Sequence, residues 1–224
     1  MKVVLAQINP TVGALKNNAQ KIIEIIREYT PKCDLIIFPE MALTGYPPQD
    51  LLLDESFIQK TQEVLNGIAS SVNSTAVIVG SIRKENHNLY NTAAVIQSGS
   101  VIAYRDKTHL PTYDVFDEVR YFTPSEFVEP VEVSVNGKSV KLGLQICEDL
   151  WDEEYETKVS KSLCNQGAEL LINISASPFH INKLNERIEL ICDKVNDLKC
   201  NFIYCNLVGA QDELVFDGQS CIVN

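Results

Sequence analysis

The sequence lacks a long apolar run, a closely spaced cysteine pair and a glycine-rich phosphate loop. No apolar segment approaches the roughly 18–20 residues that a membrane-spanning helix needs. The apolar start of the chain is broken at Gln7 and ended by Asn9-Pro10, which is too short for the core of a signal peptide. We therefore expect neither a membrane span nor a secretory leader.

Cysteine usage points to a reducing compartment. The chain has seven cysteines, an odd number, and no C-x-x-C spacing. This pattern argues against a disulfide framework and against a zinc site, so we expect a cytoplasmic protein that holds no metal. The seven are Cys33, Cys147, Cys164, Cys192, Cys200, Cys205 and Cys221.

Positive charge is also scarce. Nineteen Lys and Arg residues face 30 Asp and Glu residues, which gives a formal net charge of −11. A negative field repels phosphate backbones and anionic lipids, so nucleic-acid and membrane partners are not expected. The P-loop pattern G-x-x-x-x-G-K-[ST] does not occur either, and we predict no ATP site in this chain.

The composition is that of an ordinary globular protein. The chain has 224 residues, of which 45% are hydrophobic and 22% charged. No linker, low-complexity tract or charge block divides it, and we predict a single domain over residues 1–224.

Short apolar strands alternate with helical periodicity, which predicts an α/β fold. Two pairs of runs read as antiparallel hairpins, one around Ser98-Gly99-Ser100 and one around Asn136-Gly137. Strands are expected at 3–8, 35–38, 76–79, 89–97, 101–105, 131–135, 139–146, 170–174, 201–205 and 220–223. Helices are expected at 16–29, around 57–68, at 153–166 and around 184–198.

Three chemically useful residues stand where predicted strands end. Glu40 follows the apolar run 35–38, Lys107 follows the second strand of the first hairpin, and Cys147 ends the run 139–146. Ligand sites of open α/β sheets gather at such strand ends. Each residue also has an ordinary interpretation: a surface carboxylate, a solvated loop lysine and a small buried hydrophobe.

Together these residue types make a working set for nucleophilic catalysis. A cysteine attacks as the thiolate, a carboxylate can take its proton, and a lysine can stabilise the anion that forms. A histidine–cysteine dyad is the rival. Of the three histidines, His109 lies two residues from Lys107, and the residue chemistry alone leaves this alternative open. The long segment 106–130 fits no regular element, and loops of this length are usually functional.

The Glu…Lys…Cys order resembles the nitrilase superfamily of carbon–nitrogen hydrolases. The flanking segments are similar to the glutaminase domain of glutamine-dependent NAD synthetases, and the resemblance covers the whole chain. The segments that carry it are Phe38–Leu52, Asp106–Phe122, Cys147–Trp151 and Asp212–Gly218.

The resemblance implies a four-layer α-β-β-α sandwich with the site at the strand ends. It implies that Glu40 is the general base, that Cys147 attacks the side-chain amide of glutamine, and that Lys107 stabilises the oxyanion with the backbone N–H after Cys147. A γ-glutamyl thioester would form and ammonia would leave. Substrate-binding roles would fall to Tyr46, Tyr113, Phe116, Glu118, Ser177 and Lys183.

The resemblance also sets expectations about partners. Ammonia would pass to a synthetase domain or subunit, where ATP and magnesium would act; this chain has no Ser-Gly-Gly-x-Asp-Ser loop for ATP and no cofactor of its own. A homo-oligomer is expected. Residues 220–224 read as a strand entering a hairpin whose return strand is absent, so we expect the domain to be incomplete at its C-terminus.

Two alternatives to the glutaminase reading remain open at this point. The chain could be a free-standing amidase of the same superfamily that acts on another small amide. It could also be an incomplete, non-catalytic domain, although the presence of Glu40, Lys107 and Cys147 argues against that.

Overall fold

The computed structural model describes residues 1–224 and contains two five-stranded sheets. The first half of the chain forms β1 (Val3–Leu5), α1 (Leu15–Tyr29), β2 (Leu35–Ile37), α2 (Glu55–Ala69), β3 (Ala76–Glu85), β4 (Asn88–Gln97) and β5 (Ser100–Asp106). The second half forms β6 (Val131–Val135), β7 (Lys138–Ile146), α3 (Val159–Asn165), β8 (Leu170–Ser175), α4 (Lys183–Leu198), β9 (Asn201–Asn206), β10 (Val208–Gln211), β11 (Leu214–Asp217) and β12 (Cys221–Val223).

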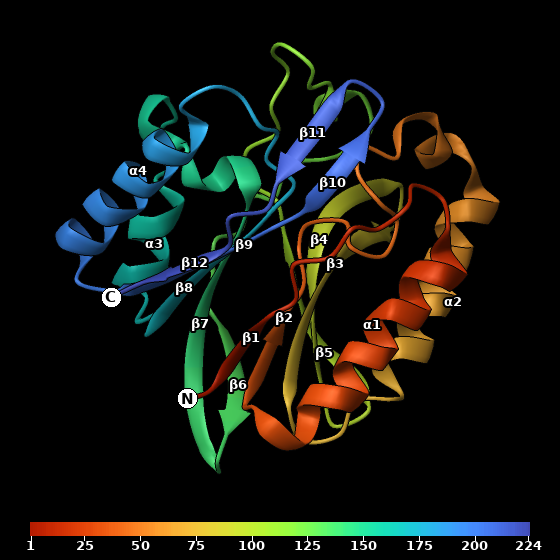
Figure 1. Ribbon diagram of the computed structural model, residues 1–224, viewed down its shortest axis with the longest axis horizontal. Helices are drawn as coiled ribbons and strands as arrows, with labels where there is room; N and C mark the ends of the chain where they lie inside the picture. The colour runs from red at the N-terminus through yellow and green to blue at the C-terminus, as the bar shows by residue number, and fades with distance from the viewer.

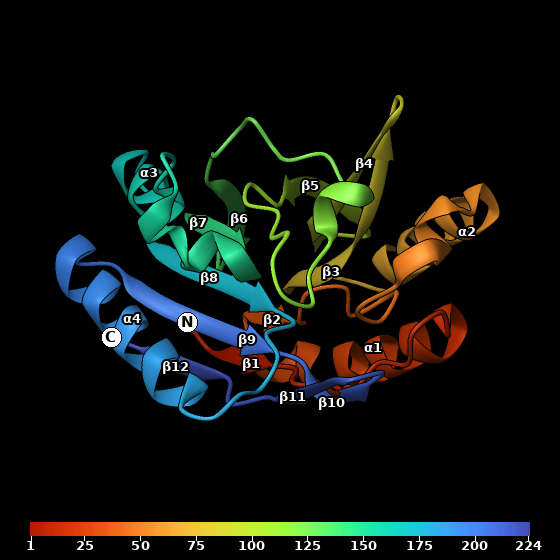
Figure 2. The same ribbon diagram turned by 90° about the horizontal axis from the view of Figure 1, so that it is seen from above.

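Each half builds one sheet. The first has the order β1-β2-β3-β4-β5, with β1, β2 and β3 parallel and the β3-β4 and β4-β5 pairs antiparallel. The second has the order β12-β9-β8-β7-β6, in which β7, β8 and β9 are parallel. Helices α1 and α2 lie on one side of the molecule, and α3 and α4 on the other (Figures 1 and 2).

Alternation along the strands explains the layers. In β2, Leu35 and Ile37 belong to the core between the two sheets, while Ile36 faces α1 and α2. In β8, Ile172 points to the inter-sheet core and Leu171 to α3 and α4. Both strands thus carry apolar side chains on their two faces, as is typical of strands covered on both sides. The predicted four-layer α-β-β-α sandwich is confirmed.

The helices carry one apolar stripe each. In α1, Leu15, Ala19, Ile22 and Ile26 repeat at helical spacing and are buried against the first sheet. Asp54 caps the N-terminus of helix α2, and its carboxylate accepts a hydrogen bond of 2.8 Å from the backbone N–H of Ser56. No helix of the structure combines the length and the apolar character that crossing a membrane requires.

Several element boundaries differ from the sequence predictions. The helix expected at 153–166 is confined to α3, because residues 152–154 form a 3-10 turn and the ammonium of Lys158 binds the carbonyls of that turn. Strand β3 runs to Glu85, because its second half pairs with β4. The β10–β11 hairpin was not predicted; its turn contains Asp212 in the left-handed conformation. Strand β12 pairs antiparallel with β9.

Candidate active site

Glu40 lies three residues after β2 and is fully buried. Its Oε1 accepts hydrogen bonds from Asn91 Nδ2 at 2.7 Å and from Lys107 Nζ at 2.9 Å. Its Oε2 accepts one from the backbone N–H of Ala176 at 2.8 Å. Donors from three separate segments therefore hold this carboxylate in one orientation.

Lys107 is the first residue after β5, and its ammonium is buried between two carboxylates. Nζ lies 2.9 Å from Glu40 Oε1 and 2.8 Å from Glu118 Oε1. Burial by itself would lower the pKa of Lys107, but Glu118, Glu40 and Cys147 outweigh it and raise that pKa well above its ordinary value. The lysine therefore remains a cation at neutral pH.

Glu118 lies on a short 3-10 turn, Glu118–Arg120, inside the long segment between β5 and β6. Its Oε1 accepts a hydrogen bond from the hydroxyl of Tyr46 at 3.1 Å, whereas its Oε2 has no hydrogen-bond partner in the protein. Burial raises the pKa of Glu118 to about 7, although Lys107 acts in the opposite direction.

Cys147 directly follows β7 and opens a 3-10 turn, with the strained φ of 43° that non-glycine residues rarely adopt. Burial first, and then the charge of Glu40, raise the pKa of the Cys147 thiol well above its ordinary value, and Lys107 only partly opposes them. The Lys107 cation offsets part of this effect, but the resting thiol stays protonated.

A pocket of about 280 Å³ opens over Cys147. Its walls combine aromatic side chains with three acidic residues, Asp114, Glu148 and Glu213, and the ammonium group of Lys183. The residues that bear on the argument are Tyr113, Phe116, Cys147, Glu148, Ser177 and Lys183.

Glu148 is one of the acidic residues in the wall of this pocket. Its carboxylate accepts hydrogen bonds from the hydroxyls of Tyr113 at 2.9 Å and Tyr155 at 3.0 Å. Burial raises the pKa of Glu148, and the two tyrosine hydroxyls partly counter that. Two tyrosine hydroxyls therefore set the orientation of this carboxylate.

Lys183 and Ser177 lie elsewhere on the wall. The ammonium of Lys183 is 3.6 Å from the ring centroid of Trp151, and burial lowers its pKa. Ser177 Oγ accepts a hydrogen bond of 3.3 Å from Arg187, a guanidinium that is itself fully buried. The pocket thus presents an anion and a cation from different elements.

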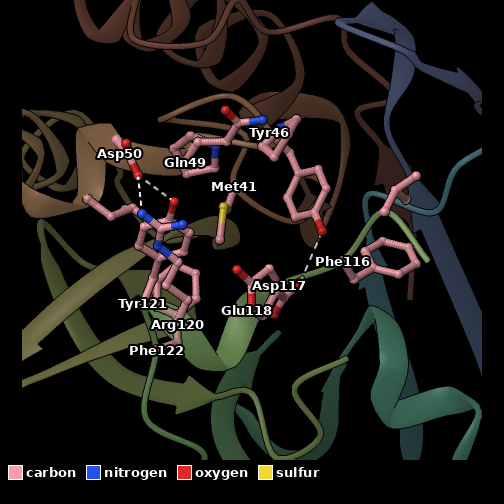
Figure 3. Close-up of a pocket in the computed structure, with 14 residues that line it drawn as sticks. Met41, Tyr46, Gln49, Asp50, Phe116, Asp117, Glu118, Arg120, Tyr121 and Phe122 are labelled. Carbon is pink, nitrogen blue, oxygen red and sulfur yellow. Dashed lines mark hydrogen bonds and ion pairs between the residues drawn. The ribbon is translucent and has the colours of Figure 1, made fainter. Parts of the chain in front are cut away.

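A second pocket of about 310 Å³ lies beside the first, and Phe116 lines both. Figure 3 shows Tyr46 directing its hydroxyl at Glu118 on one side of this second pocket. Asp50 accepts a hydrogen bond of 2.6 Å from the hydroxyl of Tyr121 on another. The resemblance implies that Tyr46 and Glu118 contact the substrate. Both residues line this second pocket, and Glu118 is linked to the reactive residues by its ion pair with Lys107.

His109 is engaged away from the thiol. Its ring stacks on Tyr155 with centroids 3.9 Å apart, and Nε2 lies 2.9 Å from the carbonyl oxygen of Thr157. The structure contains no hydrogen bond between His109 and Cys147. The geometry therefore favours the carboxylate and lysine as the partners of Cys147.

The structure also brings in residues that sequence reasoning did not select. Glu148 and Asp149 are two of them, although their position directly after Cys147 was a usable signal. Asn91 lies in the middle of β4, where nothing in the sequence distinguishes it from other strand residues. The structure contains no group of three His, Cys, Asp or Glu side chains that could hold a metal ion.

Comparison with known proteins gives a consistent result. The family model for carbon-nitrogen hydrolases matches residues 2–224. The glutamine-dependent NAD(+) synthetase of Aquifex aeolicus (strain VF5) is 41% identical over 225 residues, and that of Thermotoga maritima is 40% identical over 227 residues. The alignments cover 100% of this chain and 38% of each relative, so the chain spans less than half the length of these proteins.

Solved structures agree on the fold. A glutamine-dependent NAD+ synthetase from Acinetobacter baumannii superposes with a TM-score of 0.91 at 34% identity, over 100% of this chain and 41% of that one. An amidase of the nitrilase superfamily from Nesterenkonia AN1 superposes with a TM-score of 0.84 at 22% identity, over 100% of this chain and 82% of that one. The second likeness concerns the fold alone.

Proposed function

The chain belongs to the carbon-nitrogen hydrolase family, and on that premise we propose that it hydrolyses the side-chain amide of glutamine and releases ammonia for NAD synthesis. The names of the relatives support this substrate. The acceptor of ammonia would be a synthetase domain or subunit, where ATP and magnesium would act. The observation that carries the proposal is a buried Glu40–Lys107 ion pair whose charges act on the Cys147 thiol, which itself lines a pocket with acidic residues and the Lys183 ammonium in its wall.

The first step follows from the raised pKa of the Cys147 thiol. A protonated thiol needs a base, and Glu40 is the carboxylate whose charge acts most strongly on it. Glu40 takes the proton as Sγ bonds to the amide carbon of glutamine. The carbonyl electron pair moves onto oxygen, where the Lys107 ammonium and the backbone N–H of Glu148 stabilise the charge.

The tetrahedral intermediate then collapses. The carbon–nitrogen bond breaks, Glu40 returns its proton to the leaving nitrogen, and ammonia departs. A γ-glutamyl thioester remains on Cys147. Glu40 next takes a proton from water, whose oxygen attacks the thioester; the carbon–sulfur bond breaks, the sulfur regains the proton, and glutamate leaves.

The charged wall of the pocket supports an amino acid amide, rather than a simple amide, as the substrate. Glu148 offers a carboxylate to the α-ammonium group of glutamine. Lys183 and the hydroxyl of Ser177 offer a cation and a donor to its α-carboxylate. Charge-assisted hydrogen bonds of this kind are about twice as strong as neutral ones.

The proposal is tested by substituting Cys147→Ala and measuring glutamate release from glutamine. We expect activity to vanish while the unfolding transition stays cooperative, because alanine keeps the backbone and removes only the nucleophile. Cys33→Ala, which removes a thiol far along the chain from the site, is the matched control and retains activity. If the Cys147→Ala protein released glutamate as fast as the unmodified chain, Cys147 could not be the nucleophile.

Two further outcomes separate the alternatives. Rapid turnover of simple aliphatic amides without turnover of glutamine would indicate a free-standing amidase instead. Incubation with a glutamine-derived chloroketone tests the non-catalytic alternative. We expect peptide mass analysis to find an adduct on Cys147, and the absence of that adduct would support a domain without activity.

A further inference from the structure

Asp149 is a fully buried carboxylate two residues after the nucleophile, and all of its close hydrogen bonds go to backbone N–H groups. Oδ1 accepts from Thr108 at 3.0 Å and from His109 at 2.9 Å, and Oδ2 accepts from Ile146 at 3.0 Å. Arg105 adds charge from a distance, with Nη2 3.8 Å from Oδ2. A carboxylate with three N–H donors is anchored on both oxygens.

The three donors belong to the two chain segments that carry the reactive side chains. Thr108 and His109 immediately follow Lys107, and Ile146 immediately precedes Cys147. Lys107 directly follows a strand of the first sheet, whereas Cys147 directly follows a strand of the second. One side chain therefore joins the two sheets at the point where the ammonium and the thiol must meet.

The local backbone explains why such a link matters. Cys147 is held at a positive φ, which costs energy and persists only where surrounding contacts impose it. Lys107 begins a long segment without regular structure. Without a fixed partner, both groups would shift relative to each other, and a displacement of about 1 Å can reduce a rate about 10²-fold.

We infer that Asp149 is a positioning residue that sets the distance between the Lys107 ammonium and the Cys147 sulfur by tying both backbone segments to one carboxylate. The inference rests on the proposed function only where it predicts kcat for glutamine. The link that Asp149 makes between the two backbone segments does not depend on that function. Asparagine cannot replace the carboxylate: whichever way its amide turns, its NH₂ group faces a backbone N–H, either that of Ile146 or those of Thr108 and His109.

Gln97 provides a matched control at another junction of the two sheets. Its amide donates to the carbonyls of Ser74 at 2.9 Å and Ser134 at 2.7 Å, and its oxygen accepts from the N–H of Ser134 at 3.0 Å. Like Asp149 it makes three hydrogen bonds, two of which join β4 to β6, and none of the three reaches a reactive residue. Removing it disturbs the contact between the sheets without disturbing the site.

The experiment compares Asp149→Asn, Asp149→Glu and Gln97→Leu with the unmodified chain. The first readout is the rate at which iodoacetamide alkylates Cys147, followed by peptide mass across pH 6–10 in folded protein. The second is kcat and KM for glutamine. Alkylation needs no glutamine hydrolysis, so it stays informative even if the proposed substrate is wrong.

For Asp149→Asn we expect kcat to fall about 10²-fold with KM within about 3-fold, and the alkylation profile to move to higher pH. Asp149→Glu keeps both acceptor oxygens but displaces them, so its kcat and its alkylation profile should lie between those of Asp149→Asn and the unmodified chain. If Asp149→Asn does not fold, Asp149→Glu tests the inference in its place. Gln97→Leu should lose stability while keeping the kinetic constants and the alkylation profile. Equal kinetic effects of the Asp149 and Gln97 variants, or an unchanged alkylation profile, would overturn the inference.

Discussion

The walls of the pocket over Cys147 show how single residues acquire roles from their neighbours. The ammonium of Lys183 packs against the indole of Trp151, and this contact restricts the conformations of the flexible lysine side chain. Glu148 is oriented by two tyrosine hydroxyls. A charged side chain that is already ordered loses little entropy when a ligand arrives, so both residues suit recognition of a zwitterion.

Lys183→Met should separate binding from chemistry. The variant keeps the apolar stem and removes the cation, so we expect KM for glutamine to rise about 10- to 100-fold while kcat changes little. Turnover of butyramide, which has no α-carboxylate, should not change. Lys194→Met is the control, since Lys194 lies on the same helix but pairs with Asp152 at 2.6 Å. A similar loss for glutamine and butyramide would contradict the recognition role.

At the scale of elements, the turn after β2 depends on the strand beside it. Gly80 of β3 lies directly against this turn, where a β-carbon would come within 2.1 Å of the carbonyl oxygen of Pro39 and 2.5 Å of the N–H nitrogen of Met41. The backbone N–H of Leu43 also donates to the carbonyl of Gly80 at 3.2 Å. Glu40 therefore reaches its position because this strand carries no side chain at one point.

Gly80→Ala should displace the Glu40 turn. The contact is with backbone and cannot be relieved by a rotamer change, so we expect a loss of about 1–3 kcal/mol in unfolding free energy and a clear loss of glutamate release. In contrast, Gly67→Ala on α2 meets nothing within 4 Å and should stabilise the chain by about 0.5–1 kcal/mol with normal activity. Urea unfolding and the glutamate assay measure both. Normal activity in Gly80→Ala would show that the turn tolerates the shift.

At the scale of the whole molecule, the buried charges make stability depend on pH. Glu118 has a pKa of about 7 in the folded chain, against an ordinary value of 4.5. Between these values the folded state holds a proton that the unfolded state has released. Unfolding free energy therefore falls as pH rises through this window, by up to about 1.4 kcal/mol per pH unit from this group, and the penalty is complete above pH 7.

Glu118→Gln should remove that contribution. We expect the slope of unfolding free energy against pH between 4.5 and 7 to become less negative, by up to about 1.4 kcal/mol per unit. Urea titrations at pH 5, 6 and 7 measure the slope, which is insensitive to any constant change in stability. Glu126→Gln, an exposed carboxyl on the same segment, is the control. An unchanged slope in Glu118→Gln would mean that this carboxyl is already ionised at low pH.

The four layers were implied by the resemblance to the nitrilase superfamily, whereas local periodicity was enough to predict most elements and the strand ends that carry Glu40, Lys107 and Cys147, because apolar spacing of two or about 3.6 residues reports directly on burial. It could not predict the joining of Glu40 to Lys107, which are 67 residues apart, or the orienting bond from Asn91. Those contacts exist only once two sheets pack face to face. Packing likewise decided that Glu148 is a pocket wall and Asp149 a link between segments, since a carboxylate's role depends on which donors surround it rather than on its place in the chain.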